Sequence, residues 1–244
     1  MYGEIIPEEF SREAILLGDE SVRKLMASTA AVIGLGGVGG TAAEALCRSG
    51  VGKLMLVDGD EFARSNINRQ IFAVQETIGK KKVTGAAERI RSIAPDTELE
   101  LYDLFYNDIT ADKVPLERCG VIIDAIDMVA SKLLLIENCV RLGVPVISCM
   151  GAGNKLDPSR FEAADLASTS MCPLARVMRK ELKKRGIEHI RVIYSREPAV
   201  KPGENAPARE HSGRPVPGSA AFCAPAAGLL AAAEAVKVLL QARR

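Results

Sequence analysis

The feature that most constrains the fold is a run of glycines, Gly34-Leu35-Gly36-Gly37-Val38-Gly39, directly after the apolar segment 30–33. In a G-x-G-x-x-G motif between a strand and a helix, the glycines permit a tight turn and bring the backbone close to a phosphate. A helix is expected at 41–48 and a second apolar strand at 53–57, which ends at Asp58. An acidic residue about 20 positions after the glycines can bind ribose hydroxyls. The pattern therefore predicts a nucleotide-binding βαβ unit.

The remainder of the first 150 residues alternates between amphipathic helices and apolar strands. We expect helices at 80–93 and 131–142, and strands at 98–104, 121–125 and 144–150. Such alternation requires right-handed crossovers and is typical of α/β proteins with a parallel sheet. The predicted fold class is therefore α/β, with a Rossmann-like, doubly wound and mostly parallel sheet. A Walker P-loop is excluded, because neither Gly52-Lys53 nor Gly79-Lys80 is followed by Ser or Thr.

After Met150 the sequence changes character. We expect a C-terminal extension with a basic helix at 173–185, a strand at 191–194 and an Ala-rich helix at 220–241. We interpret residues 1–244 as a single domain, with a nucleotide-binding half at 1–150 and a substrate half at 151–244. The Pro-rich, charged segment 196–218 is expected to be a mobile loop of that second half.

The longest uncharged run, 215–233, contains three prolines and is followed directly by Glu234 and Lys237. A buried helix is therefore expected there, and no stable membrane insertion. The N-terminus lacks the apolar segment of a secretory signal, so we expect a cytoplasmic protein. The six cysteines form no C-x-x-C pair and only two histidines accompany them, which argues against zinc.

The overall charge excludes a protein that is basic throughout. With 32 basic and 31 acidic residues the net charge is +1, so any nucleic-acid contact must come from a local patch. The predicted basic helix provides one. It is either an ordinary solvated face or a surface for a nucleic-acid backbone, and its cations are Arg176, Arg179, Lys180, Lys183, Lys184 and Arg185.

A second group of cations follows the nucleotide-binding unit. Asp58-Gly59-Asp60 leads into Ser65-Asn66-Ile67-Asn68-Arg69-Gln70 and then into Gly79-Lys80-Lys81-Lys82-Val83. An NAD-linked oxidoreductase is the usual interpretation of the glycine motif, but nicotinamide binding needs no such cations. A triphosphate does, because guanidinium and ammonium groups stabilise the charge on its transferring and leaving oxygens. Asp124-Ala125-Ile126-Asp127 ends the fourth strand, where a carboxylate can hold Mg²⁺.

Taken together, these motifs resemble the ubiquitin-activating-enzyme-like adenylating family, which includes activators of sulfur-carrier proteins. The resemblance implies that Asp58 contacts the ribose and that Asp127 holds Mg²⁺. It also implies that the segment Arg12–Gly18, which matches the family's R-x-x-x-L-x-G pattern, sends Arg12 into the partner subunit's site of a homodimer. The catalytic residues implied are Arg12, Arg69, Lys82 and Asp127. The implied ATP site comprises Gly34, Gly36, Gly37, Gly39, Asp58, Asp60, Asn66, Arg69, Lys82 and Asp127.

Within that family the second half resembles the tRNA threonylcarbamoyladenosine dehydratases, on Met150-Gly151-Ala152-Gly153, Cys172-Pro173-Leu174 and Gly218-Ser219-Ala220. This implies that ATP and Mg²⁺ serve to adenylate and cyclise threonylcarbamoyladenosine beside the tRNA anticodon. Cys172 is either an acyl carrier or a structural residue, and a structural monovalent cation and a sulfur-relay protein partner are left open. The alternatives are adenylation of the C-terminal glycine of a ubiquitin-like sulfur carrier, and a nucleotide-binding scaffold without catalysis.

Overall fold

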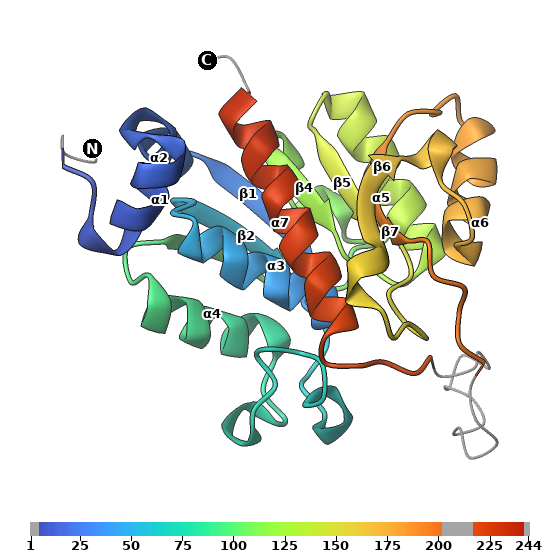
Figure 1. The fold of residues 1–244 in the computed structure, drawn as a ribbon, viewed down its shortest axis with the longest axis horizontal. Coiled ribbons are helices and arrows are strands. Elements are labelled where there is room, and N and C mark those ends of the chain that lie inside the picture. Colours follow the sequence, from blue (N-terminus) through green and yellow to red (C-terminus); the bar gives the residue numbers. More distant parts are fainter. Residues whose placement is uncertain (1–4, 202–216, 242–244) are drawn as a thin grey trace.

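A single seven-stranded sheet organises the residues that the structure, a computed structural model, describes: 5–201 and 217–241. The strand order is β3-β2-β1-β4-β5-β7-β6, and every pair is parallel except β6–β7 (Figure 1). The predicted α/β class with a mostly parallel, doubly wound sheet is confirmed. The strands are β1 Thr29–Ile33, β2 Lys53–Val57, β3 Glu98–Tyr102, β4 Val121–Asp124, β5 Val146–Cys149, β6 Phe161–Asp165 and β7 Arg191–Ser195.

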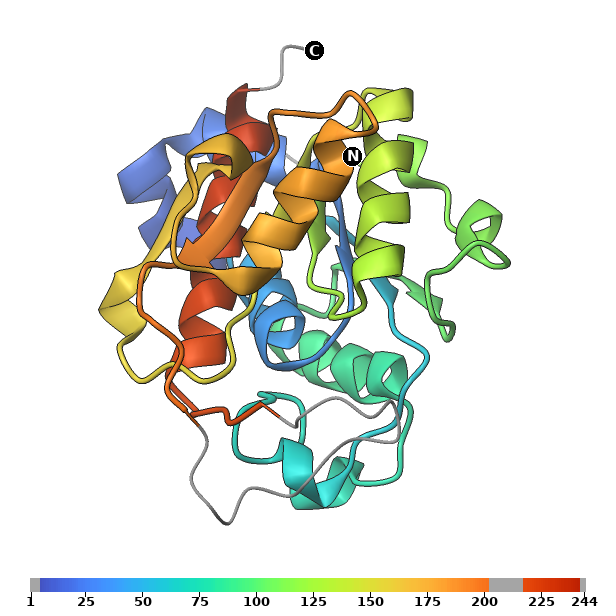
Figure 2. The ribbon, with the colours of Figure 1, turned by 90° about the vertical axis from the view of Figure 1, so that its right-hand side faces the viewer.

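Helices cover both faces of the sheet (Figures 1 and 2). One face packs against α3 (Gly37–Arg48), α4 (Lys82–Ile93) and α7 (Cys223–Gln241), and the other against α5 (Val129–Leu142) and α6 (Pro173–Lys183). Strand order reverses between β1 and β4, and ligands of open α/β sheets bind at the carboxyl ends of the strands beside such a switch point. The glycine motif leaves β1 at this position.

The N-terminal helices and one edge strand were not predicted. Helices α1 (Ser11–Leu17) and α2 (Asp19–Met26) precede β1. In α1 no residue is fully buried: Ala14 and Leu17 pack partly buried against core clusters, whereas Ile15 and Leu16 are exposed. Strand β6 is half-buried along its whole length, because as an edge strand it pairs only with β7. Short 3-10 helices lie at Glu8–Phe10, Arg64–Asn66, Gln75–Thr77, Ala111–Lys113, Leu116–Arg118, Pro158–Arg160 and Leu166–Ser168.

Several element ends differ from the sequence prediction by a few residues. The helix expected from residue 80 begins at Lys82, because Lys81 has the extended backbone of an N-cap. The basic helix ends at Lys183, and the C-terminal helix begins at Cys223. The loop expected to be mobile lies largely outside the described residues, since only 196–201 and 217–218 of it are described.

Helix α7 is the one helix in the described part of the chain that is long and apolar enough to cross a membrane, and half of its most apolar stretch is buried. It lies along α3, as Figure 1 shows, and Gly228 permits the close approach. A Cβ at Gly228 would lie 2.3 Å from the carbonyl oxygen of Val38. These contacts are those of a helix in a protein core.

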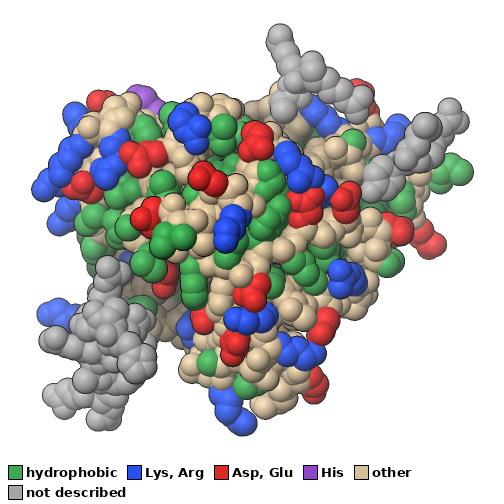
Figure 3. All heavy atoms as spheres, turned by 180° about the vertical axis from the view of Figure 1, so that it is seen from behind, with side chains coloured by type: hydrophobic (Ala, Val, Ile, Leu, Met, Phe, Trp, Pro, Cys, Tyr) green, Lys and Arg blue, Asp and Glu red, His purple; other side chains and the backbone are tan. Residues whose placement is uncertain are grey.

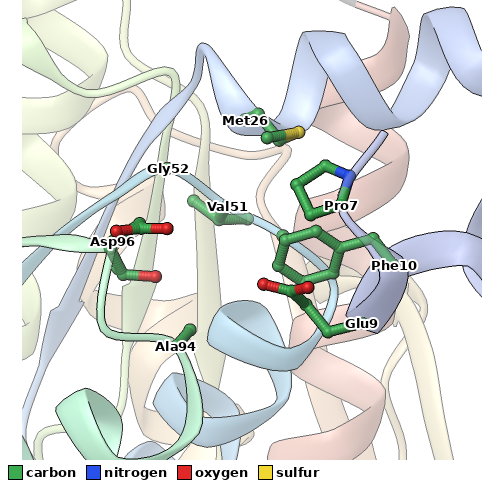
Figure 4. A pocket seen from close by; sticks show the side chains of 10 residues that line it. Pro7, Glu9, Phe10, Met26, Val51, Gly52, Ala94 and Asp96 are labelled. Atoms are coloured by element: carbon green, nitrogen blue, oxygen red, sulfur yellow. The ribbon is translucent and has the colours of Figure 1, made fainter. Parts of the chain in front are cut away.

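A small pocket of about 70 Å³ lies under the N-terminal segment (Figure 4). Its lining includes Pro7, Phe10 and Met26, together with Gly52, which directly precedes β2. The pocket is therefore at the amino-terminal edge of the sheet, opposite the glycine motif. Its volume is well below the roughly 300–1,000 Å³ of typical small-molecule sites, so we do not assign it a ligand.

Candidate functional site

The glycine motif forms a closely packed loop between β1 and α3. Gly34 has φ +93°, and its N–H donates to the carbonyl oxygen of Val57 at 2.8 Å. A Cβ at Gly34 would lie 2.7 Å from the carbonyl oxygen of Ala125, and one at Gly39 would lie 1.8 Å from that of Gly34. Glycine is therefore required at both positions. The loop ends at the N-terminus of α3, whose free N–H groups favour an anion.

Asp58, at the end of β2, holds this loop in place. Its Oδ2 accepts a hydrogen bond from the N–H of Leu35 at 2.6 Å, and its Oδ1 accepts one from the N–H of Asp60 at 2.9 Å. The carboxylate predicted to contact a ribose therefore lies directly against the glycine loop. Its side chain is almost fully buried.

The three consecutive lysines have different surroundings. Lys82 is 6% exposed, and its Nζ donates to Oδ2 of Asp60 at 2.8 Å and lies 3.8 Å from Oδ2 of Asp58. Lys80 and Lys81 are much more exposed and pair with other carboxylates. Burial alone would raise the pKa of Asp60, but the hydrogen bond and charge of Lys82 outweigh it and lower that pKa. Lys82 is therefore the lysine of the three that faces the glycine loop through Asp58.

The segment that carries Asn66 and Arg69 crosses the start of α3. Asn66 Oδ1 accepts from the N–H of Ala63, so this side chain closes its own turn. The guanidinium of Arg69 donates to the carbonyl oxygen of Ser65 at 2.8 Å, and a Cβ at Gly37 would lie 3.0 Å from the Arg69 carbonyl oxygen. The backbone carbonyl and Cγ of Arg69 thus lie beside Gly37 of the glycine loop.

The loop before α7 reaches the same place from the other half of the chain. Asn68 Nδ2 donates to the carbonyl oxygen of Ser219 at 2.9 Å, and a Cβ at Gly37 would lie 3.0 Å from Cβ of Ala224. The first turn of α7 therefore packs on the first turn of α3. Residues more than 150 positions apart in the sequence share this edge of the sheet.

Asp127 lies in the turn between β4 and α5. Its side chain is exposed and makes no hydrogen bond or ion pair within the described residues. Gly34 packs against Ala125 of the same turn, so Asp127 is a neighbour of the glycine loop. No group of three or more potential metal-ligating side chains occurs among the described residues. A single free carboxylate suits Mg²⁺, which keeps several waters and binds one or two carboxylates together with substrate phosphates.

Sequence reasoning missed a buried charge pair under that turn. Lys132 Nζ lies 3.0 Å from Oδ2 of Asp124, and both side chains are 0% exposed. Ser148 Oγ donates to the same carboxylate oxygen at 2.6 Å. The signal available in the sequence was a lysine in the first turn of the 129–142 helix, directly before the apolar run 133–136.

Exposed apolar side chains near the same edge were missed as well. Phe105 follows β3 and is 60% exposed, and a Cβ at Gly59 would meet its backbone nitrogen at 2.7 Å. Met128 follows β4 and is 54% exposed. Phe105 thus lies against Gly59, just beyond β2, and Met128 follows β4; β2 and β4 are the two strands that pair with β1. Their signal was weak, because single apolar residues in loops are common.

Arg12 is at the opposite end of the molecule from the glycine loop. It is an exposed residue of α1, and Phe10 just before this helix packs on Gly50, near the amino-terminal end of β2. Two large apolar side chains of the same helix, Ile15 and Leu16, are 86% and 82% exposed. Arg12 is therefore not brought together with Arg69, Lys82 and Asp127 within one chain.

Cys172 caps the N-terminus of α6. Its Sγ accepts from the N–H of Ala175 at 3.5 Å, and the residue is 4% exposed. The other five cysteines are also buried. Burial raises the pKa of Cys47 and Cys119 to about 11, and that of Cys139 to about 12. Cys172 thus has the contacts of a structural cap and little access to a substrate.

The basic helix presents only part of its charge to solvent. Arg179 is half-buried and donates to the carbonyl oxygens of Leu166 and Thr169, and Arg185 pairs with Glu137 and Glu181. Spacings of three and four residues place the remaining cations on the outer face, and Figure 3 shows such side chains gathered at the edge that carries α6. We call these four the basic stripe: Arg176, Lys180, Lys183 and Lys184.

Comparison with known proteins identifies a matching family. The ThiF family matches residues 10–244. The tRNA threonylcarbamoyladenosine dehydratase of Bacillus subtilis is 39% identical over 96% of this chain and 95% of its own length. The crystal structure of the Escherichia coli tRNA N6-threonylcarbamoyladenosine dehydratase with AMP has a TM-score of 0.87 and 31% identity, and covers 97% of both chains. The same enzyme with ATP gives a TM-score of 0.86 and 32% identity over 96% of both chains.

Proposed function

Because the chain belongs to the ThiF family, we propose that it is an ATP-dependent dehydratase of tRNA threonylcarbamoyladenosine. The observation that carries the proposal is the meeting of the glycine loop, Lys82, Arg69 and Asp127 at one edge of the sheet. The relatives named above provide the substrate class, since they cover nearly the whole chain and carry that name.

The reaction has two steps. A free carboxylate of the modified nucleoside attacks the α-phosphorus of ATP, and the bond to the leaving pyrophosphate breaks. A nitrogen or oxygen of the same modification then attacks the acyl carbon, and AMP leaves as the ring closes. The nucleoside loses one water, whose oxygen leaves on AMP. Ring closure is intramolecular, so proximity alone can provide effective molarities of about 10⁵ M or more, and no protein nucleophile is required.

The residues of the site have distinct roles in the first step. The glycine loop and the N-terminus of α3 bind phosphate, and Asp58 lies where a ribose would meet the loop. Lys82 and Arg69 stabilise negative charge on the triphosphate, and Asn66 fixes the turn that carries Arg69. Phe105, which lies against Gly59 just beyond β2, offers apolar surface for the adenine. Asp127 would hold Mg²⁺, which supplies positive charge for the triphosphate when it is bound.

The basic stripe on α6 is the proposed contact for the tRNA backbone. Its cations project to solvent, and among the described residues the acids paired with them are Glu181, in the last turn of the helix, and Glu188, beyond its end. Phosphate contacts by such cations position an RNA without reading its sequence. Arg179 is outside this proposal, because carbonyl oxygens of the chain already occupy its guanidinium.

We also propose a homodimer in which Arg12 completes the site of the partner subunit. Arg12 sits near the amino-terminal edge of the sheet, so it is remote from the glycine loop of its own chain. The exposed Ile15 and Leu16 on the same helix supply apolar surface that a second copy would bury. A two-fold axis then places each Arg12 against the opposite site.

The test uses the purified chain, ATP, Mg²⁺ and tRNA that carries threonylcarbamoyladenosine. We expect one AMP, one pyrophosphate and one cyclic nucleoside for each modified tRNA consumed, measured by mass analysis of the digested tRNA. Unmodified tRNA of the same sequence is the control and should release no AMP. Pyrophosphate exchange driven by a small ubiquitin-like carrier protein, without any on modified tRNA, would contradict the proposal and favour the carrier-activating alternative.

A further inference from the structure

A buried network of Asp124, Lys132 and Ser148 lies under the site and holds the turn between β4 and α5. Ile126, in the turn between β4 and α5, donates its N–H to Oδ1 of Asp124 at 3.1 Å. The Nζ of Lys132 donates to the carbonyl oxygen of Ile126 at 3.0 Å. Both backbone groups of the residue before Asp127 are therefore held by side chains of one ion pair.

Each member of the network is saturated by partners within the protein. Lys132 has three acceptors for its three protons: Oδ2 of Asp124 at 3.0 Å and the carbonyl oxygens of Asp124 and Ile126. The Asp124 carboxylate receives Lys132, the hydroxyl of Ser148 and the N–H of Ile126. The network is therefore closed, and neither charge is available to a ligand.

Stability alone does not explain such a pair. Removing two charges from water is costly, and replacing a buried ion pair by apolar residues of similar volume often leaves a protein equally or more stable. What an apolar core would lose is the pair of directed bonds to Ile126. The turn also carries Ala125, against which Gly34 packs, so the network places Asp127 relative to the glycine loop.

We propose that Lys132 and Asp124 are positioning residues that hold Asp127 at the phosphate end of the site. The inference rests on the proposed function, because Asp127 matters only if the chain binds Mg²⁺ with a triphosphate. Lys132 touches neither ATP nor tRNA. It acts through the backbone of Ile126, and a carboxylate displaced by about 1 Å can cost about 10²-fold in rate.

The experiment replaces the whole network by apolar residues in the full-length chain. The variant combines Asp124→Val, Lys132→Met and Ser148→Ala, so that no charge or hydroxyl is left buried without a partner. The matched control removes the ion pair between Arg191 and Glu234 by changing both to Leu. That pair is at the amino-terminal end of β7, away from the glycine loop.

We expect the triple variant to remain folded, with a melting temperature close to that of the wild type, while the peptide containing Ile126 exchanges its amide hydrogens faster. The kcat for AMP release should fall by about 10²-fold with KM for ATP nearly unchanged, because the glycine loop and Asp58 are intact. The control should keep wild-type kcat and exchange. Wild-type kcat, or unchanged exchange at Ile126, in the triple variant would overturn the inference.

A milder variant keeps the inference testable if the triple variant does not fold. Ser148→Ala removes one hydrogen bond to Asp124 and should raise exchange at Ile126 with a smaller loss of kcat. Unchanged exchange and kcat would overturn the inference. If the wild type itself forms no cyclic nucleoside, the proposed function fails. In that case the positioning role is tested separately by two measurements: amide hydrogen exchange at Ile126, and the affinity for Mg²⁺ with ATP measured by calorimetry.

Discussion

Changing Lys82 to Met should lower the rate of adenylation by about 10²–10³-fold and leave the fold almost intact, although two identical side chains precede Lys82 in the sequence. The structure separates the three lysines by their surroundings. Lys82 is buried beside Asp58 and Asp60, whereas Lys80 pairs with the exposed Glu88 and Lys81 with Glu61 and Asp103. Only Lys82 is linked to the glycine loop, through Asp58.

The cost of this change to the free energy of unfolding is small. Asp60 is largely exposed, so its pair with Lys82 contributes about 1 kcal/mol or less. Asp58 keeps hydrogen bonds from the N–H groups of Leu35 and Asp60, so its carboxylate is not left without partners. For a chain of this size, about 1 kcal/mol lowers the melting temperature by about 2–4 °C.

The expected cost to the reaction is larger. Removing one preorganised group that faces developing charge typically lowers the rate by about 10²–10³-fold, equivalent to about 2.7–4 kcal/mol. Pyrophosphate release with modified tRNA measures this loss, and thermal unfolding measures stability in the same preparations. Lys80→Met and Lys81→Met are matched controls, which should keep both properties. If Lys82→Met kept the wild-type rate, or if either control lost it, our assignment of Lys82 to the phosphates would be wrong.

Four further predictions follow from the described contacts. In Asp127→Ala the rate of AMP release should fall by about 10²-fold. The melting temperature should not change, because the exposed carboxylate of Asp127 has no partner within the described residues. Mixing subunits of Arg12→Ala and Asp127→Ala should restore up to about half of wild-type activity per heterodimer if sites are shared, and nothing if they are not. Changing the three lysines of the basic stripe to Gln should flatten the salt dependence of tRNA binding by about 0.7–0.9 log units per lost phosphate contact, and an unchanged slope would contradict the tRNA surface. Burial raises the pKa of Glu44, but hydrogen bonds from Arg89 and Arg48 outweigh this effect and lower the pKa below 4.5. The stabilising contribution of the Glu44 carboxylate is therefore present above pH 4.5, and it is lost as the pH falls through the pKa of the folded state. Urea unfolding of Glu44→Gln should therefore differ from the wild type at neutral pH and converge with it in acid.

The sheet was largely predictable from the sequence because its central strands are buried on both faces. A strand such as β2 is a continuous apolar run, and its predicted and observed bounds agree at Lys53–Val57. The same reasoning failed for β6. Every residue of this edge strand is half-buried, so its sequence shows no alternation of apolar and polar residues. It failed for α1 for a related reason. Its two largest exposed side chains, Ile15 and Leu16, are apolar, so the apolar positions of its sequence do not mark the side that packs on the core.

The candidate site was predictable in its residue types and less so in its contacts. Motif order placed Asp58 beside the glycine loop, because consecutive parallel strands end at the same edge. The spacing of the cations could not show that Arg179 turns inward to the carbonyl oxygen of Leu166. In the sequence of a basic helix, nothing distinguishes a cation that faces the protein from one that faces solvent. Nor could spacing pair Lys132 with Asp124, because that contact depends on how α5 packs beneath the end of β4.

Two aspartate–lysine pairs at this edge of the sheet differ in the exposure of the carboxylate, and this difference favours opposite roles. The pair of Lys82 with Asp60 has an exposed carboxylate, so separating the two charges costs little and the ammonium can transfer its contact to an arriving phosphate. The pair of Lys132 with Asp124 has no exposed atom, so separating it would leave a charge buried without a partner. On the proposed function, the first pair exchanges partners during each turnover and the second stays closed throughout. The proposal requires both, because Lys82 has to move onto the triphosphate while the carboxylate of Asp127 keeps its place.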